Sequence, residues 1–360
     1  MTIDMQQAWA HRRKLAGLLL PALLAMACIP AGASAGQAPP DGRCYLIDTD
    51  VEIDDVRAIA MLAQTGRVAA VVATEGISHT PEGVGALREM LGRGGQADIP
   101  VVRGASPNPK WPAQLDLDNL KTWRENAERL NHLLDAPVPA ADPPTADIAA
   151  ALRPHLAGCH RVTLLVIGPW TSFLRYAAEV LERVDRIVAQ GRPYPDELSG
   201  QPDGFNCRYD LDSCFAAFDL LTGRQQRADR RVRTDWVDIP NGLRACGKAE
   251  PGVDEHGTKL YAFRPDANWI PALEHAKGKM AQAIAAMLRA YPEGWERTSL
   301  WDDLAALYLL RPDVFAARGG HMEPCVPAAA VRRMLTEALA AELPRWAARP
   351  RTAETGPARP

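Results

Sequence analysis

The chain has 360 residues, and its 41 Lys and Arg residues nearly balance its 44 Asp and Glu residues, so the formal net charge is only −3. This balance argues against a nucleic-acid-binding protein, which usually carries a basic face. Hydrophobic residues make up 47% of the chain and charged residues 24%, values ordinary for a folded protein, which excludes a wholly disordered chain.

The first 35 residues have the pattern of a secretory signal peptide. Basic residues at 11–14 precede an apolar run from Leu15 to Ile29, and Ala33-Ser34-Ala35 matches the small residues of a cleavage site. We therefore expect residues 1–35 to be removed and the mature protein to start near Gly36. Its expected location is secreted or periplasmic.

A membrane-anchored start is the alternative. The apolar run is short for a membrane span and is interrupted by Pro21, with Pro30 directly behind it. A lipoprotein signal ending at Cys28 is less favoured, because Ala25 stands where a Leu is usual. No later run is long and apolar enough to cross a bilayer, so we expect no membrane span in the mature protein.

Cysteines are the next feature along the chain. The sequence has seven cysteines, and removal of residues 1–35 with Cys28 would leave six, an even number that permits disulfides in an oxidising compartment. Cys44 begins an apolar strand and is expected to be a buried thiol. Cys207, Cys214 and Cys246 lie in loop-like sequence and are the better disulfide candidates, with their pairing left open. The six cysteines of the mature chain are Cys44, Cys159, Cys207, Cys214, Cys246 and Cys325.

Apolar runs typical of buried strands alternate with segments of helical period through the first half of the mature chain. We predict strands over 45–47, 68–73, 99–102, 162–167 and 184–189. We predict helices over 54–64, 81–91, 117–134, 145–156 and 171–181. This alternation predicts an α/β fold with a mainly parallel central sheet and helices on both faces.

The later part of the chain is richer in helical patterns. We predict helices over 270–290, 299–310 and 326–341. From about residue 344 onward the chain is rich in Pro, Arg and Ala, which predicts a disordered tail over 344–360. Because no internal repeat or clear linker is present, residues 36–343 are expected to form one domain with an α-rich C-terminal part.

Five carboxylates fall within the eight residues from Asp48 to Asp55, directly after the first predicted strand. Capping of the next helix explains one or two of them, since acidic residues favour a helix N-terminus. It does not explain five, with no basic residue before Arg57. Like charges this close do not all stay ionised unless a cation compensates them, which predicts a site for a hard divalent cation.

Three further segments supply groups that could complete such a site. Gly168-Pro169-Trp170-Thr171 follows a predicted strand, and a turn there exposes backbone carbonyls. Phe205-Asn206 precedes Asp210 and Asp212, and Trp301-Asp302-Asp303 opens a helix. Each has an ordinary explanation as a turn, loop or cap. In parallel sheets, however, ligands lie at the carboxyl ends of the strands, where the first of these segments falls.

Together the four segments resemble motifs of the inosine-uridine-preferring nucleoside hydrolase family. The family pattern D-T-D-P-G-x-D-D corresponds to D-T-D-V-E-I-D-D at 48–55, and G-P-L-T-N corresponds to G-P-W-T-S at 168–172. The pattern E-F-N followed by D-P-E corresponds to G-F-N at 204–206 and D-L-D at 210–212. An Asp after His or Trp, followed by P-L-A, corresponds to W-D-D-L-A at 301–305. Order and spacing agree from about residue 43 to 315.

The resemblance implies a Rossmann-like fold and calcium-dependent hydrolysis of the N-glycosidic bond of ribonucleosides to base and ribose. It implies that Ca²⁺ binds to Asp50, Asp55, the backbone carbonyl of Thr171 and Asp302. Asp50 would also be the general base. Carboxylate and carbonyl oxygens are the ligands that Ca²⁺ prefers, and a bound cation lowers the pKa of its water.

The same resemblance assigns the contacts around the metal. Asp54 and Asn206 would bind ribose hydroxyls, and Asp48 would support the metal ligands. The ribose pocket departs from the family pattern, because Gly76-Ile77 replaces a Gly-Asn pair and Gly204 replaces the Glu of E-F-N, although Asp203 is adjacent.

Two substitutions point toward the purine-specific branch of the family. Val51-Glu52 replaces Pro-Gly, and Glu52 lies where purine-specific members carry an Asn, so it could replace a lost contact. Trp301 stands where that branch stacks an aromatic residue on the base. Trp111 is the candidate for a second stacking residue. The expected partner is a small nucleoside, and a homo-oligomer stays open.

Two other functions fit part of the pattern. In a haloacid dehalogenase-like phosphatase, Asp48-Thr49-Asp50-Val51 would be the D-x-D motif, with Asp302-Asp303 as the late acidic pair and magnesium as the ion. That family does not explain Gly168–Thr171 or Phe205-Asn206, and no Lys is well placed between the strands. The altered ribose pocket also fits a non-catalytic, calcium-dependent nucleoside- or sugar-binding protein.

Overall fold

The computed structural model describes residues 39–107, 117–133, 145–191, 204–225, 232–239, 263–265, 268–292, 298–318 and 320–344. All of them belong to the unit Gly36–Pro360. Several expectations fall outside the described residues: the signal peptide over 1–35, the stacking role of Trp111, a disulfide at Cys246 and the tail after residue 344.

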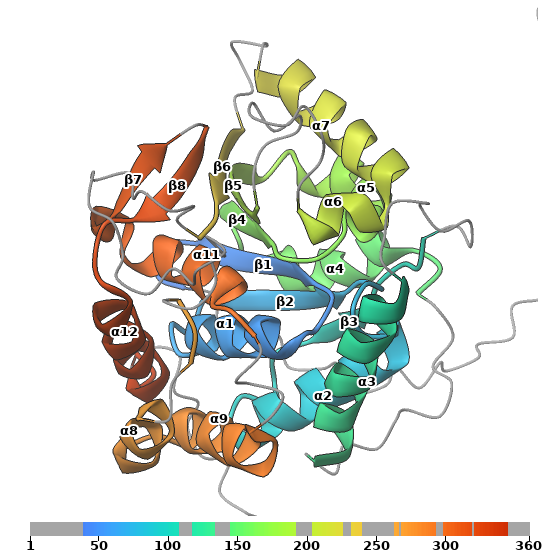
Figure 1. Ribbon diagram of the computed structural model, residues 1–360. Coiled ribbons are helices and arrows are strands. Elements are labelled where there is room, and N and C mark those ends of the chain that lie inside the picture. Colours follow the sequence, from blue (N-terminus) through green and yellow to red (C-terminus); the bar gives the residue numbers. More distant parts are fainter. Residues whose placement is uncertain are drawn as a thin grey trace, which may run out of the picture. The chain divides into compact units, whose positions relative to one another are not determined.

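An eight-stranded sheet organises the fold (Figure 1). Its strands are β1 (Arg43–Thr49), β2 (Val68–Ala73), β3 (Val101–Arg103), β4 (Arg161–Val166), β5 (Val184–Gln190), β6 (Arg233–Val237), β7 (Phe315–Arg318) and β8 (His321–Pro324). Their order in the sheet is β3-β2-β1-β4-β5-β6-β8-β7. Neighbouring strands pair in parallel, and only β7 runs antiparallel to its neighbour β8. The predicted mainly parallel sheet is confirmed.

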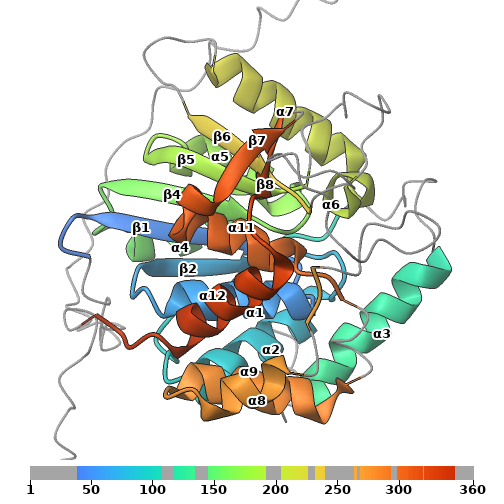
Figure 2. The same cartoon turned by 60° about the vertical axis from the view of Figure 1, so that its left-hand side comes forward.

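Helices cover both faces of the sheet, as expected (Figures 1 and 2). One face packs against α1 (Ile53–Ala63), α2 (Thr80–Arg93), α8 (Trp269–His275), α9 (Lys279–Ala290), α11 (Trp301–Leu310) and α12 (Ala328–Ala340). The other face packs against α4 (Ile148–Leu156), α5 (Thr171–Val180) and α7 (Leu211–Gln225). Among the described helices, none combines the length and apolarity needed to cross a bilayer.

The continuous apolar runs of the strands reflect this two-sided burial. In β1, Ile47 joins the core under α1 and α11, whereas Leu46 joins the core under α4 and α5. In β4, Leu165 and Leu164 divide in the same way. Because successive side chains of a strand point to opposite faces, a strand buried on both sides needs an apolar residue at every position.

The predicted helix over 270–290 is divided into α8 and α9. The chain leaves the helical conformation at Ala276, which is extended, and Gly278 has φ 143°. L-residues with a side chain avoid this φ, so the glycine permits the change of direction. The predicted helical conformation is confirmed on both sides of the break. The three non-helical residues between α8 and α9 were not predicted.

Two disulfides are present among the described residues. Cys44 is bonded to Cys159, so the expectation that Cys44 is a buried thiol is wrong. Cys44 is the second residue of β1 and Cys159 lies two residues before β4, and these neighbouring parallel strands bring the two residues together. Cys207 is bonded to Cys214, which confirms both as disulfide cysteines. Cys325 is also disulfide-bonded.

The strand order reverses between β1 and β4. From β1 the chain winds outward through β2 to β3, then returns to the other side of β1 at β4 and continues to β5 and β6. Loops that leave β1 and β4 at their carboxyl ends therefore turn to opposite sides and leave room for a ligand between them. The segment 48–55 starts with the last two residues of β1, and the segment 168–171 follows β4.

Candidate metal centre

Helix α1 begins with a reciprocal cap that fixes two of the predicted site residues. Glu52 is the N-cap residue, and its side chain accepts from the backbone N–H of Asp55. Asp55 Oδ2 in return accepts from the backbone N–H of Glu52 at 3.0 Å. The hydroxyl of Thr49 donates to the other oxygen of Asp55. The Asp55 carboxylate is thus held from two sides at the end of β1.

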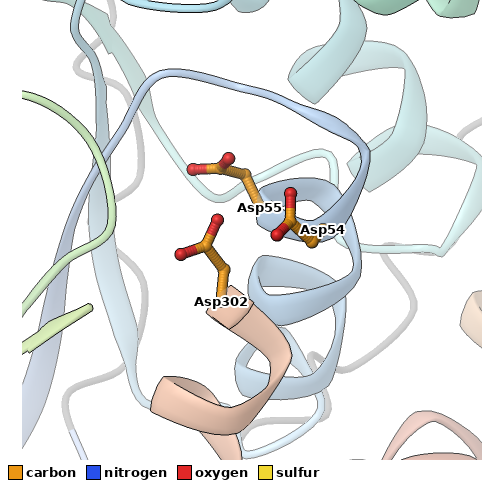
Figure 3. A group of neighbouring side chains, drawn as sticks. All are labelled: Asp54, Asp55 and Asp302. Atoms are coloured by element: carbon orange, nitrogen blue, oxygen red, sulfur yellow. The ribbon is translucent and has the colours of Figure 1, made fainter. Parts of the chain in front are cut away.

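Three carboxylates converge where α1 and α11 begin (Figure 3). Asp54 and Asp55 lie in the first turn of α1, and Asp302 lies in the first turn of α11. Each offers one carboxylate oxygen, and these oxygens all lie within 4.8 Å of one another. All three residues are buried. We call Asp54, Asp55 and Asp302 the acidic cluster.

Burial and mutual repulsion disfavour the charged form of the acidic cluster. Burial is the largest cause in each case. Neighbouring carboxylates add to it for Asp54 and Asp302, whereas hydrogen bonds with Thr49 and Asp302 oppose it for Asp55. The pKa of Asp55 is raised to about 6, and the pKa values of Asp54 and Asp302 are raised well above their ordinary range. The pKa of Glu52 is raised to about 7 by burial and by Asp55. A bound cation would remove this penalty.

The donor set fits a hard divalent cation. Asp54 Oδ1 is buried and has no hydrogen-bond partner among the described residues, although Asp54 is only 1% exposed. A buried carboxylate oxygen without a donor is costly unless a ligand supplies positive charge. Several convergent carboxylate oxygens are the donors that Ca²⁺ or Mg²⁺ uses.

Asp50 lies between the loops that follow β2 and β4. Its Oδ2 accepts from the backbone N–H of Ile77 at 2.8 Å. A Cβ on Gly76 would lie 2.2 Å from Asp50 Oδ2, and a Cβ on Gly168 would lie 2.6 Å from the Asp50 backbone nitrogen. The two glycines therefore permit both loops to close around Asp50.

The loop from β1 to α1 takes an unusual path at Val51. Its φ is 59°, the only positive value among the described non-glycine residues, and it is costly for a β-branched side chain. Its N–H donates to the Thr49 hydroxyl at 3.1 Å. Proline stands here in the family pattern, but proline cannot adopt a positive φ and has no N–H to donate. The Val51-Glu52 substitution is therefore accompanied by a backbone path that proline could not take.

Asp48 is fully buried behind the site and is bonded by neighbouring hydroxyls. Thr74 donates to Oδ1, and Tyr176 donates to Oδ2 at 2.7 Å. Burial raises the pKa of Asp48 to about 7, and the two hydroxyls oppose that rise. This arrangement is compatible with the supporting role expected for Asp48.

The helix α6 (Phe205–Tyr209) carries Asn206 to the carboxyl end of β4. Asn206 is buried, and its side-chain amide donates to the carbonyl of Ile167 at 3.0 Å. Thr171 begins α5, and its hydroxyl donates to Asp210 Oδ2 at 2.6 Å. Both predicted residues thus lie at the edge of the sheet where β1 and β4 end.

The helix α3 (Leu117–Leu133) packs against the loop that holds Asp50. Arg124 donates to the carbonyls of Gly76 and Ile77 at 2.7 and 3.0 Å and to Tyr209 of α6 at 3.0 Å. Figure 2 shows α3 and α6 to the right of the sheet, α3 below and α6 above. The side chain of Ile77 joins Leu120 in a small apolar cluster there, which accounts for an apolar residue where the family pattern has Asn.

Trp301 begins α11 beside Asp302 and is half-buried, with its side chain packed against the core. Arg57 and Asp303 form a buried ion pair close to the acidic cluster. The two were not paired from the sequence, where Asp303 was considered only as part of the acidic pair of a phosphatase. Their signals were present: Asp303 follows Asp302 directly, and Arg57 is the first basic residue after the acidic segment.

Open parallel α/β sheets bind small ligands at the carboxyl ends of their strands, near the switch point, and the buried carboxylates lie at that edge. Residues 45–192 match the model of the inosine-uridine preferring nucleoside hydrolase family. The chain is therefore a hydrolase that acts on N-glycosyl bonds of nucleosides. The match includes 48–55 and 168–171, while Asn206 and Asp302 lie beyond it.

Solved structures confirm the fold. The purine-preferring ribonucleoside hydrolase from Gardnerella vaginalis is 15% identical, with a TM-score of 0.51, covering 83% of this chain and 98% of that one. The type III effector protein XopQ complexed with adenosine diphosphate ribose is 15% identical, with a TM-score of 0.53, covering 83% and 93%. No curated protein sequence matches the chain significantly.

Proposed function

We propose that this nucleoside hydrolase depends on calcium and prefers purine ribonucleosides. The observation that carries the calcium dependence is the acidic cluster, whose three carboxylates are buried and lie within reach of one ion. Asp55 and Asp302 would hold the ion together with Asp50 and the backbone carbonyl of Thr171, and Asp54 would lie beside it. When bound, Ca²⁺ would neutralise the cluster, lower the pKa of a water molecule and orient ribose hydroxyls.

The proton of the attacking water goes to Asp50. Because Ile77 N–H binds Oδ2, we assign Oδ1 as the oxygen that accepts the proton. The water oxygen attacks the anomeric carbon of the ribose while the bond from that carbon to the base nitrogen breaks. The loops that follow β2 and β4 hold Asp50 in one place, and such fixed geometry lowers the barrier of the step.

Substrate contacts are proposed for residues around the acidic cluster. Asp54 and Asn206 would bind ribose hydroxyls, and Glu52 would add a contact at the start of α1. Trp301, and Trp111 outside the described residues, would stack on the base. Stacking of a base on an aromatic side chain is worth about 1–3 kcal/mol in nucleic-acid-binding proteins, and it tolerates any large flat base.

The purine preference is tested by replacing Trp301 with Ala. Stacking on the indole would favour a protonated, cationic purine, since an indole itself donates no acidic proton near neutral pH. We expect a larger loss of turnover with inosine or guanosine than with p-nitrophenyl riboside, which has an activated leaving group. Equal losses on both substrates would contradict a role of Trp301 in leaving-group departure.

A non-catalytic binding protein is the second candidate. It is favoured by Ile77, whose apolar side chain replaces a family Asn, and by Asn206, whose amide already donates to Ile167. Calorimetry with inosine, adenosine and uridine in the presence of Ca²⁺, followed by an assay of released base, separates the two. Base release supports the hydrolase, whereas tight binding without release supports the binding protein.

Export to an oxidising compartment is also proposed. The Cys44–Cys159 and Cys207–Cys214 disulfides support it, since such bonds persist outside the cytosol. Mass spectrometry of the N-terminus of the mature protein tests it. We expect a start near Gly36, and a lipidated Cys28 would contradict a soluble mature form.

A further inference from the structure

The acidic cluster is assembled from two helices that are far apart in the sequence. Asp54 and Asp55 come from α1, Asp302 comes from α11, and the two helices pack against each other. Carboxylates that repel one another would push these helix starts apart when no cation is bound. Apolar side chains of α1 and α11 pack in one core, and a polar contact beside the cluster also joins the first turn of α11 to α1.

The buried pair of Arg57 and Asp303 provides that contact. Arg57 lies on α1 two residues after Asp55, and Asp303 directly follows Asp302. Arg57 Nε donates to Asp303 Oδ1 at 3.0 Å, and Nη2 donates to Asp303 Oδ2 at 2.7 Å. Both side chains are fully buried. A planar guanidinium that binds both oxygens of a carboxylate restricts distance and orientation together.

Two further contacts hold the guanidinium of Arg57. Nη2 also donates to the backbone carbonyl of Ser299, which lies just before α11, at 3.1 Å. The guanidinium lies over the ring of Trp269 in α8, 5.8 Å from its centroid. Arg57 thus binds the chain on both sides of Asp302, through Ser299 and Asp303, and its charge also acts on Asp54 and Glu52.

A gain in folding stability is a weak explanation for a buried ion pair of this kind. Removing two charges from water is costly, and replacing a whole buried ion pair by apolar side chains of similar volume is often neutral or stabilising. Asp303 also departs from the motif in which this chain otherwise resembles its family, because it stands where the pattern Asp-Pro-Leu-Ala has Pro. The pair is therefore a feature of this chain for which a local role is expected.

We propose that the Arg57–Asp303 pair positions Asp302 opposite Asp54 and Asp55 and thereby sets the affinity of the site for a divalent cation. This inference rests on the proposed function, since it concerns the same site. Arg57 and Asp303 are positioning residues that act through Asp302, and they do not contact the ion. Loss of residues that orient metal ligands typically weakens metal binding 10–100-fold.

The test replaces the pair by apolar side chains of similar size, Arg57→Met with Asp303→Leu. The control replaces the Arg186–Asp235 pair, where Nε and Oδ2 are 2.8 Å apart, by Met and Leu. Arg186 lies over the ring of Tyr308, in the last turn of α11, 4.8 Å from its centroid, so the control alters an ion pair at the other end of the same helix.

Calcium affinity is measured by calorimetry, and the melting temperature is measured in EDTA. We expect the Arg57→Met, Asp303→Leu variant to fold and to bind Ca²⁺ about 10–100-fold more weakly than the wild type. The control variant should bind Ca²⁺ as the wild type does. Unchanged affinity in the folded double variant would overturn the positioning role.

The variant Arg57→Lys covers the case in which the double variant does not fold. Lysine keeps the charge and removes the planar fork. We expect weaker Ca²⁺ binding from this variant too, and wild-type affinity would overturn the proposal. If the wild-type protein binds no Ca²⁺, the metal site of the proposed function fails as well, so the wild-type titration separates the two failures.

Discussion

At the scale of single residues, Asp302 has opposite effects on the metal-free and the metal-bound protein. Its buried carboxylate repels Asp54 and Asp55 when no cation is present, and it would bind the cation when one is. Asp302→Asn should therefore raise the melting temperature in EDTA, because one like charge is removed. The same variant should lose most of the rise in melting temperature that Ca²⁺ causes in the wild type.

Thermal denaturation with and without Ca²⁺ measures both effects. Asp219→Asn on α7 is the matched control, since Asp219 is exposed and lies on the other face of the sheet. It should melt like the wild type under both conditions. A full Ca²⁺ response in Asp302→Asn would show that Asp302 is no ligand.

Val51 gives a second prediction at this scale. Val51→Pro restores the residue of the family motif, yet it should destabilise the protein. Proline cannot adopt φ 59°, and it removes the N–H that donates to Thr49. We expect the free energy of unfolding to fall by more than about 1 kcal/mol. Proline stabilises a protein slightly by restricting its unfolded chain, but the strain of an incompatible φ in the folded protein outweighs that gain.

Urea denaturation of Val51→Pro and Val51→Ala separates backbone from side-chain effects. Both variants lose apolar contacts of the buried valine, but only proline is excluded from the observed φ. Val51→Pro should be the less stable of the two. If it is the more stable one, the loop can take the path of the family motif after all.

At the scale of elements, the Cys44–Cys159 disulfide joins the starts of two central strands across 115 residues. The Cys207–Cys214 disulfide spans only seven residues and serves as the comparison. A cross-link that closes a longer loop removes more entropy from the unfolded chain. Loop-closure entropy predicts losses of about 5 and about 2 kcal/mol when each pair is replaced by Ala.

Chemical denaturation of the two double Ala variants measures these losses. The Cys44→Ala, Cys159→Ala variant should be the less stable one by roughly 2 kcal/mol or more. Equal stability of the two variants would show that the long disulfide acts on the folded state or on residual structure in the unfolded chain.

The strands that sequence patterns predicted most clearly are those buried on both faces of the sheet. β2 is apolar throughout, and β1 and β4 each carry an apolar run, as expected for strands covered on both faces. β6 was missed because its sequence Arg-Thr-Asp-Trp-Val is largely polar. It pairs with β8 at only one position, Val237 with Met322, and Asp235 forms ion pairs across the sheet surface, so polar residues are tolerated there.

At the scale of the whole molecule, the site joins residues about 250 positions apart. The motifs placed Asp50, Asp55 and Asp302 near one another only through resemblance, because sequence spacing carries no distance between segments so remote. The grouping of Asp54 with Asp55 and Asp302, and the buried Arg57–Asp303 pair behind them, needed the packing of α1 against α11. The sequence therefore predicts which residue types each segment contributes, but not how the segments pack together to form the site.

The most direct test of the central claim is base release from inosine by metal-free protein as Ca²⁺ is added back. We predict no turnover in EDTA and a saturable return of activity with Ca²⁺. The Asp302→Asn variant should need much more Ca²⁺ or stay inactive. Full hydrolysis of inosine in EDTA by protein shown to be free of metal would contradict a cation held by the acidic cluster.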